Sequence, residues 1–175
     1  MQRDQGDIEL PDEQELYKAA ERVLDLGHRK GLTVGTAESC TGGLVTGALT
    51  AVPGSSAVVK GGITSYAIPV KHAVLGVSDG ILDAPGVGAV SSECAEAMAE
   101  GARRVLLTDV AVSVTGIAGP GGEEPGKPVG TVWFGLSCGG FTRSEMHILS
   151  GDRKTVRLKA VRIALGLLAE GLESL

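Results

Sequence analysis

The sequence of 175 residues contains no asparagine, and its three glutamines all lie within the first 14 residues. No loop after the first helix can therefore supply a carboxamide side chain to a site. No apolar run approaches the length of a membrane span, and the first residues lack the apolar core of a secretory signal. We expect a cytoplasmic protein that makes no contact with a membrane.

Cysteine and basic residues are also scarce. Cys40, Cys94 and Cys138 show no metal-ligand spacing, and an odd number fits reduced thiols, so we expect no bound metal. Lysine and arginine number 16 against 21 acidic residues, a net charge of -5. Because a nucleic-acid groove needs clustered cations, this balance excludes nucleic acid as a partner, while a local basic pocket for a small anion stays compatible with it.

The residues that are present favour a soluble α/β protein. The composition is 43% hydrophobic and 21% charged, with 27 glycines and only 3% aromatic residues, and the length suits one domain. We expect a mobile lead-in over residues 1–10 and a single domain over residues 11–175.

Hydrophobic periodicity predicts the order of the elements. Helices are expected over about 11–31, 42–52 and 91–106 and from about 152 onward, and strands near 32–36, 63–66, 109–114, 131–136 and 141–148. Gly139 and Gly140 join the last two strands as an antiparallel hairpin. The pattern predicts a three-layer α/β/α sandwich around a mixed, mostly parallel sheet. Because ligands bind at the carboxyl ends of parallel strands, a site is expected from the loops 37–43, 67–71 and 115–130.

Ser39 lies between an expected strand and an expected helix, in the run from Thr36 to Gly43. The first N–H groups of a helix lack partners and favour negative charge, so a hydroxyl here suits a nucleophile. The alternative is that Ser39 or Thr41 only caps the helix. Cys40 is a rival nucleophile, or else a buried packing residue.

A serine nucleophile needs a base. His28, His72 and His147 stand in no recognisable triad setting. Lys71 follows apolar residues that would lower its pKa, although a surface lysine is the alternative. Tyr66 is a candidate for relaying a proton or orienting substrate, or for ordinary packing.

The segment 115–130 is long and rich in glycine, which lets backbone amides approach a ligand, although a surface excursion is the alternative. Gly121 to Lys127 spells G-x-x-x-x-G-K, but Pro128 and a strand follow it, so we reject a P-loop. Since the site loops lack carboxamides, an oxyanion would rest on backbone amides around Cys40 to Gly43, together with Thr115.

Arg153 lies at the start of the last helix, where a cation is electrostatically disfavoured unless an anion compensates. We therefore consider it a phosphate ligand. The alternative is a solvated charge paired with Asp152 or Glu145.

Four separated segments together resemble the CinA C-terminal domain family, the nicotinamide-nucleotide amidases. They are residues 36–43, Tyr66 with Lys71, residues 116–122 leading into 127–132, and residues 150–153. The resemblance covers residues 11–172. It implies an α/β/α fold, no cofactor, and hydrolysis of nicotinamide mononucleotide to nicotinate mononucleotide and ammonia.

Matched position by position, the resemblance implies that Ser39 is the nucleophile, Lys71 its base, and Tyr66 a supporting catalytic residue. It also implies that Thr115 and Arg153 support catalysis or binding. Together with the loop amides considered above, the residues expected to bind substrate are Cys40, Thr41, Gly42, Gly43, Thr115, Gly116, Gly119 and Arg153. We expect a homo-oligomer. The segment 67–70 is apolar where the family often carries polar residues including asparagine, and the chain has no room for the larger N-terminal domain of some relatives.

Two other functions stay open. One is a non-catalytic nucleotide-binding or interaction module of the competence/damage-inducible type. The other is an amidase that acts on another small amide.

Overall fold

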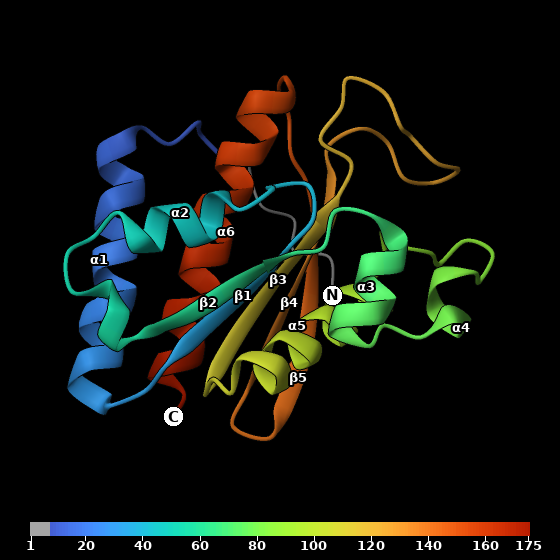
Figure 1. Ribbon diagram of the computed structural model, residues 1–175. Helices are drawn as coiled ribbons and strands as arrows, with labels where there is room; N and C mark the ends of the chain where they lie inside the picture. Colours follow the sequence, from blue (N-terminus) through green and yellow to red (C-terminus); the bar gives the residue numbers. More distant parts are fainter. Residues whose placement is uncertain (1–7) are drawn as a thin grey trace.

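A five-stranded sheet forms the centre of the computed structural model, which describes residues 8–175 (Figure 1). The strands are β1 (Val34–Glu38), β2 (Val59–Thr64), β3 (Val110–Gly116), β4 (Thr131–Cys138) and β5 (Phe141–Ile148). Their order across the sheet is β2-β1-β3-β4-β5. β1 is parallel to both β2 and β3, while β4 and β5 are antiparallel to their neighbours.

Helices cover both faces of this sheet. They are α1 (Glu13–Lys30), α2 (Leu44–Thr50), α3 (Ile68–Leu75), α4 (Asp79–Leu82), α5 (Ser92–Leu106) and α6 (Arg153–Glu173), with a 3-10 turn at Ser55–Ala57. α1, α2 and α6 pack on one face, and α3, α4 and α5 on the other (Figure 1). The predicted three-layer sandwich around a mixed sheet, including the terminal hairpin, is therefore confirmed.

The helix boundaries follow from local capping signals. Asp12 caps α1 in a reciprocal pair of hydrogen bonds with Glu15, and Gly31 ends that helix in the left-handed conformation. Ser91 and Asp152 cap α5 and α6 through their side chains. Each cap satisfies amides that would otherwise lack partners, so these boundaries were readable from the sequence.

Two boundaries around the second strand differ from the sequence prediction. β2 begins four residues earlier than expected, because Gly61 and Gly62 interrupt the apolar pattern that marks a strand. Glycine is needed at Gly62, where a Cβ would lie 1.9 Å from Thr46 Oγ1 of α2. The expected loop at 67–71 is also wrong in part, since α3 begins at Ile68 with Pro69 in its first turn, and Lys71 therefore lies on a helix.

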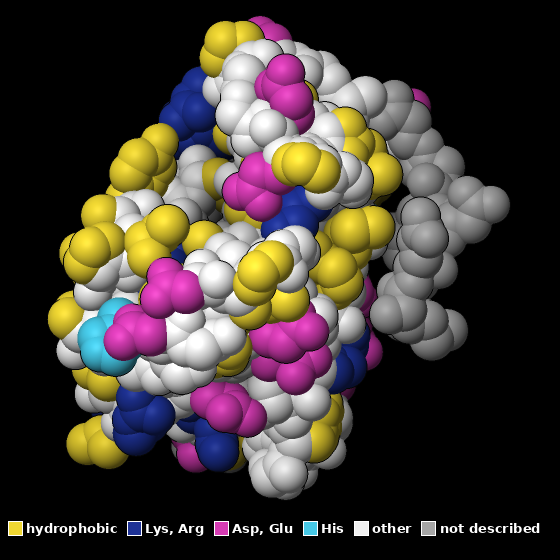
Figure 2. All heavy atoms as spheres, turned by 90° about the vertical axis from the view of Figure 1, so that its right-hand side faces the viewer, with side chains coloured by type: hydrophobic (Ala, Val, Ile, Leu, Met, Phe, Trp, Pro, Cys, Tyr) yellow, Lys and Arg dark blue, Asp and Glu magenta, His cyan; other side chains and the backbone are white. Residues whose placement is uncertain are grey.

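The outer surface of the α3–α5 layer is chemically mixed. Figure 2 shows hydrophobic and acidic side chains interspersed over this side of the molecule, with Lys and Arg between them. Among residues 8–175, no helix is long and apolar enough to cross a bilayer.

α3 is held against α5 by a close backbone approach at Gly101. A Cβ on Gly101 would lie 2.1 Å from the carbonyl oxygen of Leu75, the last residue of α3. Any side chain at this position must push the two helices apart. Gly101 therefore fixes the distance of α3, and of Lys71 on it, from the rest of the molecule.

We predict that Gly101→Ala displaces α3 and lowers the free energy of unfolding by about 1–3 kcal/mol, the usual cost of overpacking. The control is Gly166→Ala in α6, where a Cβ meets no atom within 4 Å. Alanine in that helix should leave stability unchanged or raise it by up to about 1 kcal/mol. Denaturant unfolding of both variants measures the difference, and equal stabilities would show that α3 has room to move.

Candidate functional site

Ser39 and Lys71 meet at the carboxyl end of the central parallel strands. Ser39 directly follows β1, and Lys71 reaches it from α3, with Lys71 Nζ 2.9 Å from Ser39 Oγ. Lys71 Nζ also lies 2.5 Å from the carbonyl oxygen of Ser65, just after β2. Residues 32 positions apart are thus joined in one hydrogen-bonded pair.

The environment of Lys71 disfavours its charged form. Lys71 is only 1% exposed, and none of the ion pairs within residues 8–175 involves it. Burial lowers the pKa of Lys71 below its ordinary value, while the neighbouring thiols of Cys94 and Cys40 act more weakly in the opposite direction. A neutral amine fits this geometry, since one N–H can bind Ser65 O while the lone pair accepts the Ser39 hydroxyl proton.

Several backbone N–H groups in and around the turn after Ser39 already donate hydrogen bonds to other groups of the protein. The Ser39 N–H donates to Val114 O on β3 at 2.9 Å, and the Gly42 N–H donates to Ser39 O at 3.1 Å. The Gly43 N–H donates to the carboxylate of Glu38 at 3.0 Å. The amides of Gly42 and Gly43 are therefore already occupied.

Two neighbouring amides are left over. Within residues 8–175, neither the Cys40 N–H nor the Thr41 N–H has an acceptor. Their carbonyl oxygens are both taken by Arg157 of α6, whose Nε and Nη2 lie 3.1 Å from Cys40 O and 3.0 Å from Thr41 O. These two N–H groups directly follow the candidate nucleophile, in residues that are themselves buried, with Cys40 6% exposed and Thr41 0%.

The cap of α2 corrects a sequence expectation. Neither Ser39 nor Thr41 caps this helix, and Thr41 Oγ1 is buried without a hydrogen-bond partner. The buried carboxylate of Glu38 instead accepts from the amides of Gly43, Val45 and Thr46. Sequence reasoning missed Glu38, because it ends β1 and is separated from the start of α2 by the turn at residues 39–43, so no local capping signal marks it.

Arg153 joins two segments at the rim of the site. Its Nη1 donates to Gly119 O at 2.9 Å, and its Nη2 donates to the Tyr66 hydroxyl oxygen at 3.1 Å. The alternative pairing with Glu145 does not occur, since Glu145 binds Arg143 and His147. Tyr66 is 62% exposed, so it is a rim residue and the packing alternative for it is wrong.

Arg157 is a second arginine that sequence reasoning missed. It lies four residues after Arg153 on α6, so both side chains point from the same helix face toward the site loops. Figure 1 shows the start of α6 beside these loops. The spacing of the two arginines was the available signal.

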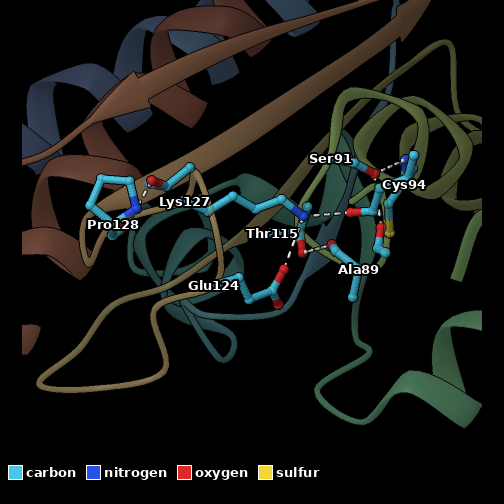
Figure 3. A network of polar contacts seen from close by, with 10 residues as sticks. Ala89, Ser91, Cys94, Thr115, Glu124, Lys127 and Pro128 are labelled. Atoms are coloured by element: carbon cyan, nitrogen blue, oxygen red, sulfur yellow. Dashed lines mark hydrogen bonds and ion pairs between the residues drawn. The ribbon is translucent and has the colours of Figure 1, made fainter. Parts of the chain in front are cut away.

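Thr115 lies at the edge of the site and faces a different loop. Its hydroxyl donates to Ala89 O at 2.6 Å, in the segment between α4 and α5 (Figure 3). Lys127 of the G-x-x-x-x-G-K sequence binds the same segment, at 2.6 Å from Val87 O, and also pairs with Glu124 at 3.0 Å. The glycine-rich loop is thereby fastened to the neighbouring loop, and Lys127 has protein partners.

Gly116 and the cysteines have clear structural roles. A Cβ on Gly116 would lie 2.6 Å from Thr131 O on β4, so glycine permits the close strand pairing there. Cys40 is buried, and burial raises the pKa of its thiol to about 11. The thiol is therefore protonated at neutral pH, which disfavours Cys40 as the rival nucleophile. Within the described part of the chain, no cluster of His, Cys, Asp and Glu could hold a metal ion.

We predict that the lowered pKa of Lys71 makes stability depend on pH in a way that Lys71→Met removes. Between the folded-state pKa and the ordinary value of 10.5, the unfolded chain binds the extra proton, so wild-type stability rises with pH across this window. The stability of Lys71→Met relative to wild type should therefore be greatest at about pH 7 and decline toward about pH 10. Thermal unfolding over this range measures the trend, and a constant difference would show that Lys71 titrates normally.

Comparison with known proteins places this chain in a family. It matches the CinA C-terminal domain family over residues 16–172. It is 48% identical to a CinA-like protein of Myxococcus xanthus over 90% of this chain and 37% of that protein, and 45% identical to one of Dictyoglomus thermophilum over 89% and 37%. The chain thus spans about a third of the length of these curated relatives.

Solved structures share the fold as well as the sequence. The competence/damage inducible protein CihA of Agrobacterium tumefaciens superposes with a TM-score of 0.86 at 41% identity, covering 95% of this chain and 99% of that one. The competence damage-inducible protein A of Klebsiella pneumoniae gives a TM-score of 0.86 at 36% identity, over 90% and 97%. The chain belongs to the CinA C-terminal domain family.

Proposed function

We propose that this chain is a serine amidase that hydrolyses the carboxamide of nicotinamide mononucleotide to nicotinate mononucleotide and ammonia. The observation that carries the proposal is the 2.9 Å contact between Ser39 Oγ and the buried Nζ of Lys71. A hydroxyl next to a desolvated amine is a nucleophile with its base in place. The family resemblance supports the nucleotide as substrate.

Acylation uses Lys71 first as a base. The neutral amine takes the Ser39 proton as Oγ attacks the carboxamide carbon, which forms a C–O bond and moves the C=O electron pair onto oxygen. The resulting oxyanion accepts hydrogen bonds from the N–H groups of Cys40 and Thr41. Preorganised donors of this kind stabilise the transition state because they need no reorientation during the reaction.

Release of ammonia returns the proton. The Lys71 ammonium protonates the carboxamide nitrogen, the C–N bond breaks, and ammonia leaves an acyl ester on Ser39. Lys71, neutral again, then takes a proton from water as the water oxygen attacks the ester carbon. Breaking the C–O bond frees the carboxylic acid, and Lys71 gives the proton back to Ser39 Oγ.

Substrate recognition rests on the rim. Arg153 has a guanidinium that is suited to a phosphate, and Tyr66 offers a hydroxyl beside it. Ser65 O binds Lys71 Nζ and keeps the amine oriented. The apolar residues 67–70 at the start of α3 leave the ribose and base contacts in this stretch to other groups.

We predict that the wild-type protein releases ammonia from nicotinamide mononucleotide and that Ser39→Ala and Lys71→Met each lower kcat by at least about 1000-fold, as for other catalytic units. Cys40→Ala is the matched control, since it keeps Ser39 and removes a thiol that is protonated at neutral pH. A coupled ammonia assay measures all four proteins.

Each outcome of these activity and binding measurements has a distinct meaning. Full activity in both Ser39→Ala and Lys71→Met would contradict the mechanism. Binding of the nucleotide without turnover in wild type would favour a non-catalytic binding module. Ammonia release from another small amide, but not from the nucleotide, would keep the mechanism and replace the substrate.

We further predict that Arg153→Gln raises KM for nicotinamide mononucleotide by about 10- to 100-fold, the value of one charge-assisted hydrogen bond. KM for the riboside, which lacks the phosphate, should change little. Tyr66→Phe removes the hydroxyl that accepts from Arg153 but keeps the guanidinium, and it should raise KM only several-fold, about 2- to 10-fold. An equal loss with both substrates would show that Arg153 only fastens Gly119 to Tyr66.

A further inference from the structure

We infer that Glu38 and Arg157 are positioning residues that together set the direction of the two oxyanion-hole amides after Ser39. The inference rests on the proposed amidase function. Neither side chain has a hydrogen bond to Ser39 Oγ or Lys71 Nζ, and both bind the backbone of the turn around the nucleophile. The negatively charged Glu38 accepts hydrogen bonds from backbone N–H groups, whereas the positively charged Arg157 donates to backbone carbonyl oxygens.

Arg157 sets the direction of the Thr41 amide through peptide geometry. The Cys40 carbonyl and the Thr41 N–H belong to one planar trans peptide, so they point in opposite directions. Arg157 Nε draws the Cys40 carbonyl oxygen toward α6 at 3.1 Å. The Thr41 N–H therefore points away from Arg157, and no acceptor for it lies within residues 8–175.

The Cys40 amide is set by the same rule one peptide earlier. Its N–H shares a peptide with the Ser39 carbonyl, whose oxygen accepts the Gly42 N–H at 3.1 Å. This hydrogen bond closes the turn and directs the Cys40 N–H outward. The chain then continues through Gly42 and Gly43 in left-handed conformations, with φ of +63° and +99°.

Glu38 holds the far end of this turn. Its carboxylate is 1% exposed and accepts from the Gly43, Val45 and Thr46 amides at 3.0, 3.1 and 2.8 Å, and from the Thr46 hydroxyl at 2.8 Å. A carboxamide could not accept all of these hydrogen bonds, because one of its two polar groups is an NH₂ donor. Because the Glu38 carboxylate accepts hydrogen bonds from the amides at the start of α2, these amides are not available to bind a substrate anion.

Glu38 and Ser39 are successive residues of an extended chain and therefore point to opposite faces of the sheet. Glu38 is bound on the side of α2, and Ser39 meets Lys71 on the side of α3. The turn is thus anchored on one face while its nucleophile is presented on the other. Loss of the anchors should disturb the transition state, which uses the two amides, more than the binding of substrate.

The experiment compares Arg157→Gln, Arg157→Lys and Glu38→Gln with wild type by kcat and KM for amide hydrolysis. Arg157→Gln and Glu38→Gln should lower kcat by about 10- to 100-fold with KM changed by less than about twofold, since a misplaced donor costs rate. Arg157→Lys keeps one donor and should fall between Arg157→Gln and wild type. The controls are Arg162→Gln, an exposed arginine of α6, and Glu93→Gln, an exposed acid in the first turn of α5, which should match wild type.

A second measurement separates this inference from the proposed function. The rate at which a fluorophosphonate labels Ser39 reports the nucleophile and its oxyanion donors without an amide substrate. If wild type hydrolyses no amide but is labelled, the proposed function fails, and slower labelling of Arg157→Gln still supports the positioning role. A wild type that is neither active nor labelled overturns both.

Variants with kcat and labelling rates within about twofold of wild type would overturn the inference, as would a rise in KM at unchanged kcat. Circular dichroism checks that each variant is folded. If Glu38→Gln does not fold, Thr46→Val replaces it, because that change removes only one of the hydrogen bonds to the Glu38 carboxylate, together with the contact to Thr36 Oγ1. A Thr46→Val kcat equal to wild type, together with an unaffected Arg157→Gln, would then decide against the proposal.

Discussion

The burial of one lysine is the constraint on which the rest of this structure depends. An amine that is 1% exposed and lacks an ion-pair partner within residues 8–175 is costly to charge, so the fold must hydrogen-bond its neutral form. Two oxygens lie within hydrogen-bonding distance of it, Ser39 Oγ and the carbonyl oxygen of Ser65. The close approach of α3 to α5 at Gly101 keeps the amine at that depth. Stability and reactivity of the site are thus set by the same packing.

The position of the site follows from the topology of the sheet. β1 lies between β2 and β3 and is parallel to both, so the carboxyl ends of three strands meet at one edge. The chain leaves these ends toward opposite layers, to α2 after β1 and to α3 after β2 (Figure 1). α6 then returns from the end of the sequence and binds both the turn after Ser39 and the glycine-rich loop. Residues from four parts of the chain thereby share one edge.

Sequence reasoning succeeded where a local rule applied. Asp12, Ser91 and Asp152 mark helix starts through their own capping oxygens, and the Gly139–Gly140 turn marks the hairpin. It failed where a residue satisfies a distant group. Glu38 caps a helix five to eight residues away, Arg157 binds carbonyls more than 100 residues away, and Thr115 turns its hydroxyl to another loop. The type of a residue determines which groups it can hydrogen-bond, but the packing of the folded chain determines which of them becomes its partner.

The sequence by itself determined the layers, the hairpin and the candidacy of Ser39 and Lys71, because periodicity, caps and motif spacing are local properties of the chain. Only the tertiary structure decided that these two side chains lie 2.9 Å apart, that Lys71 is buried, and that Cys40 and Thr41 keep free amides while Gly42 and Gly43 do not. The physical reason is that a pKa and an open hydrogen-bond donor depend on every group packed around them. Those groups come from residues that are far apart in the sequence and near one another only in the folded chain.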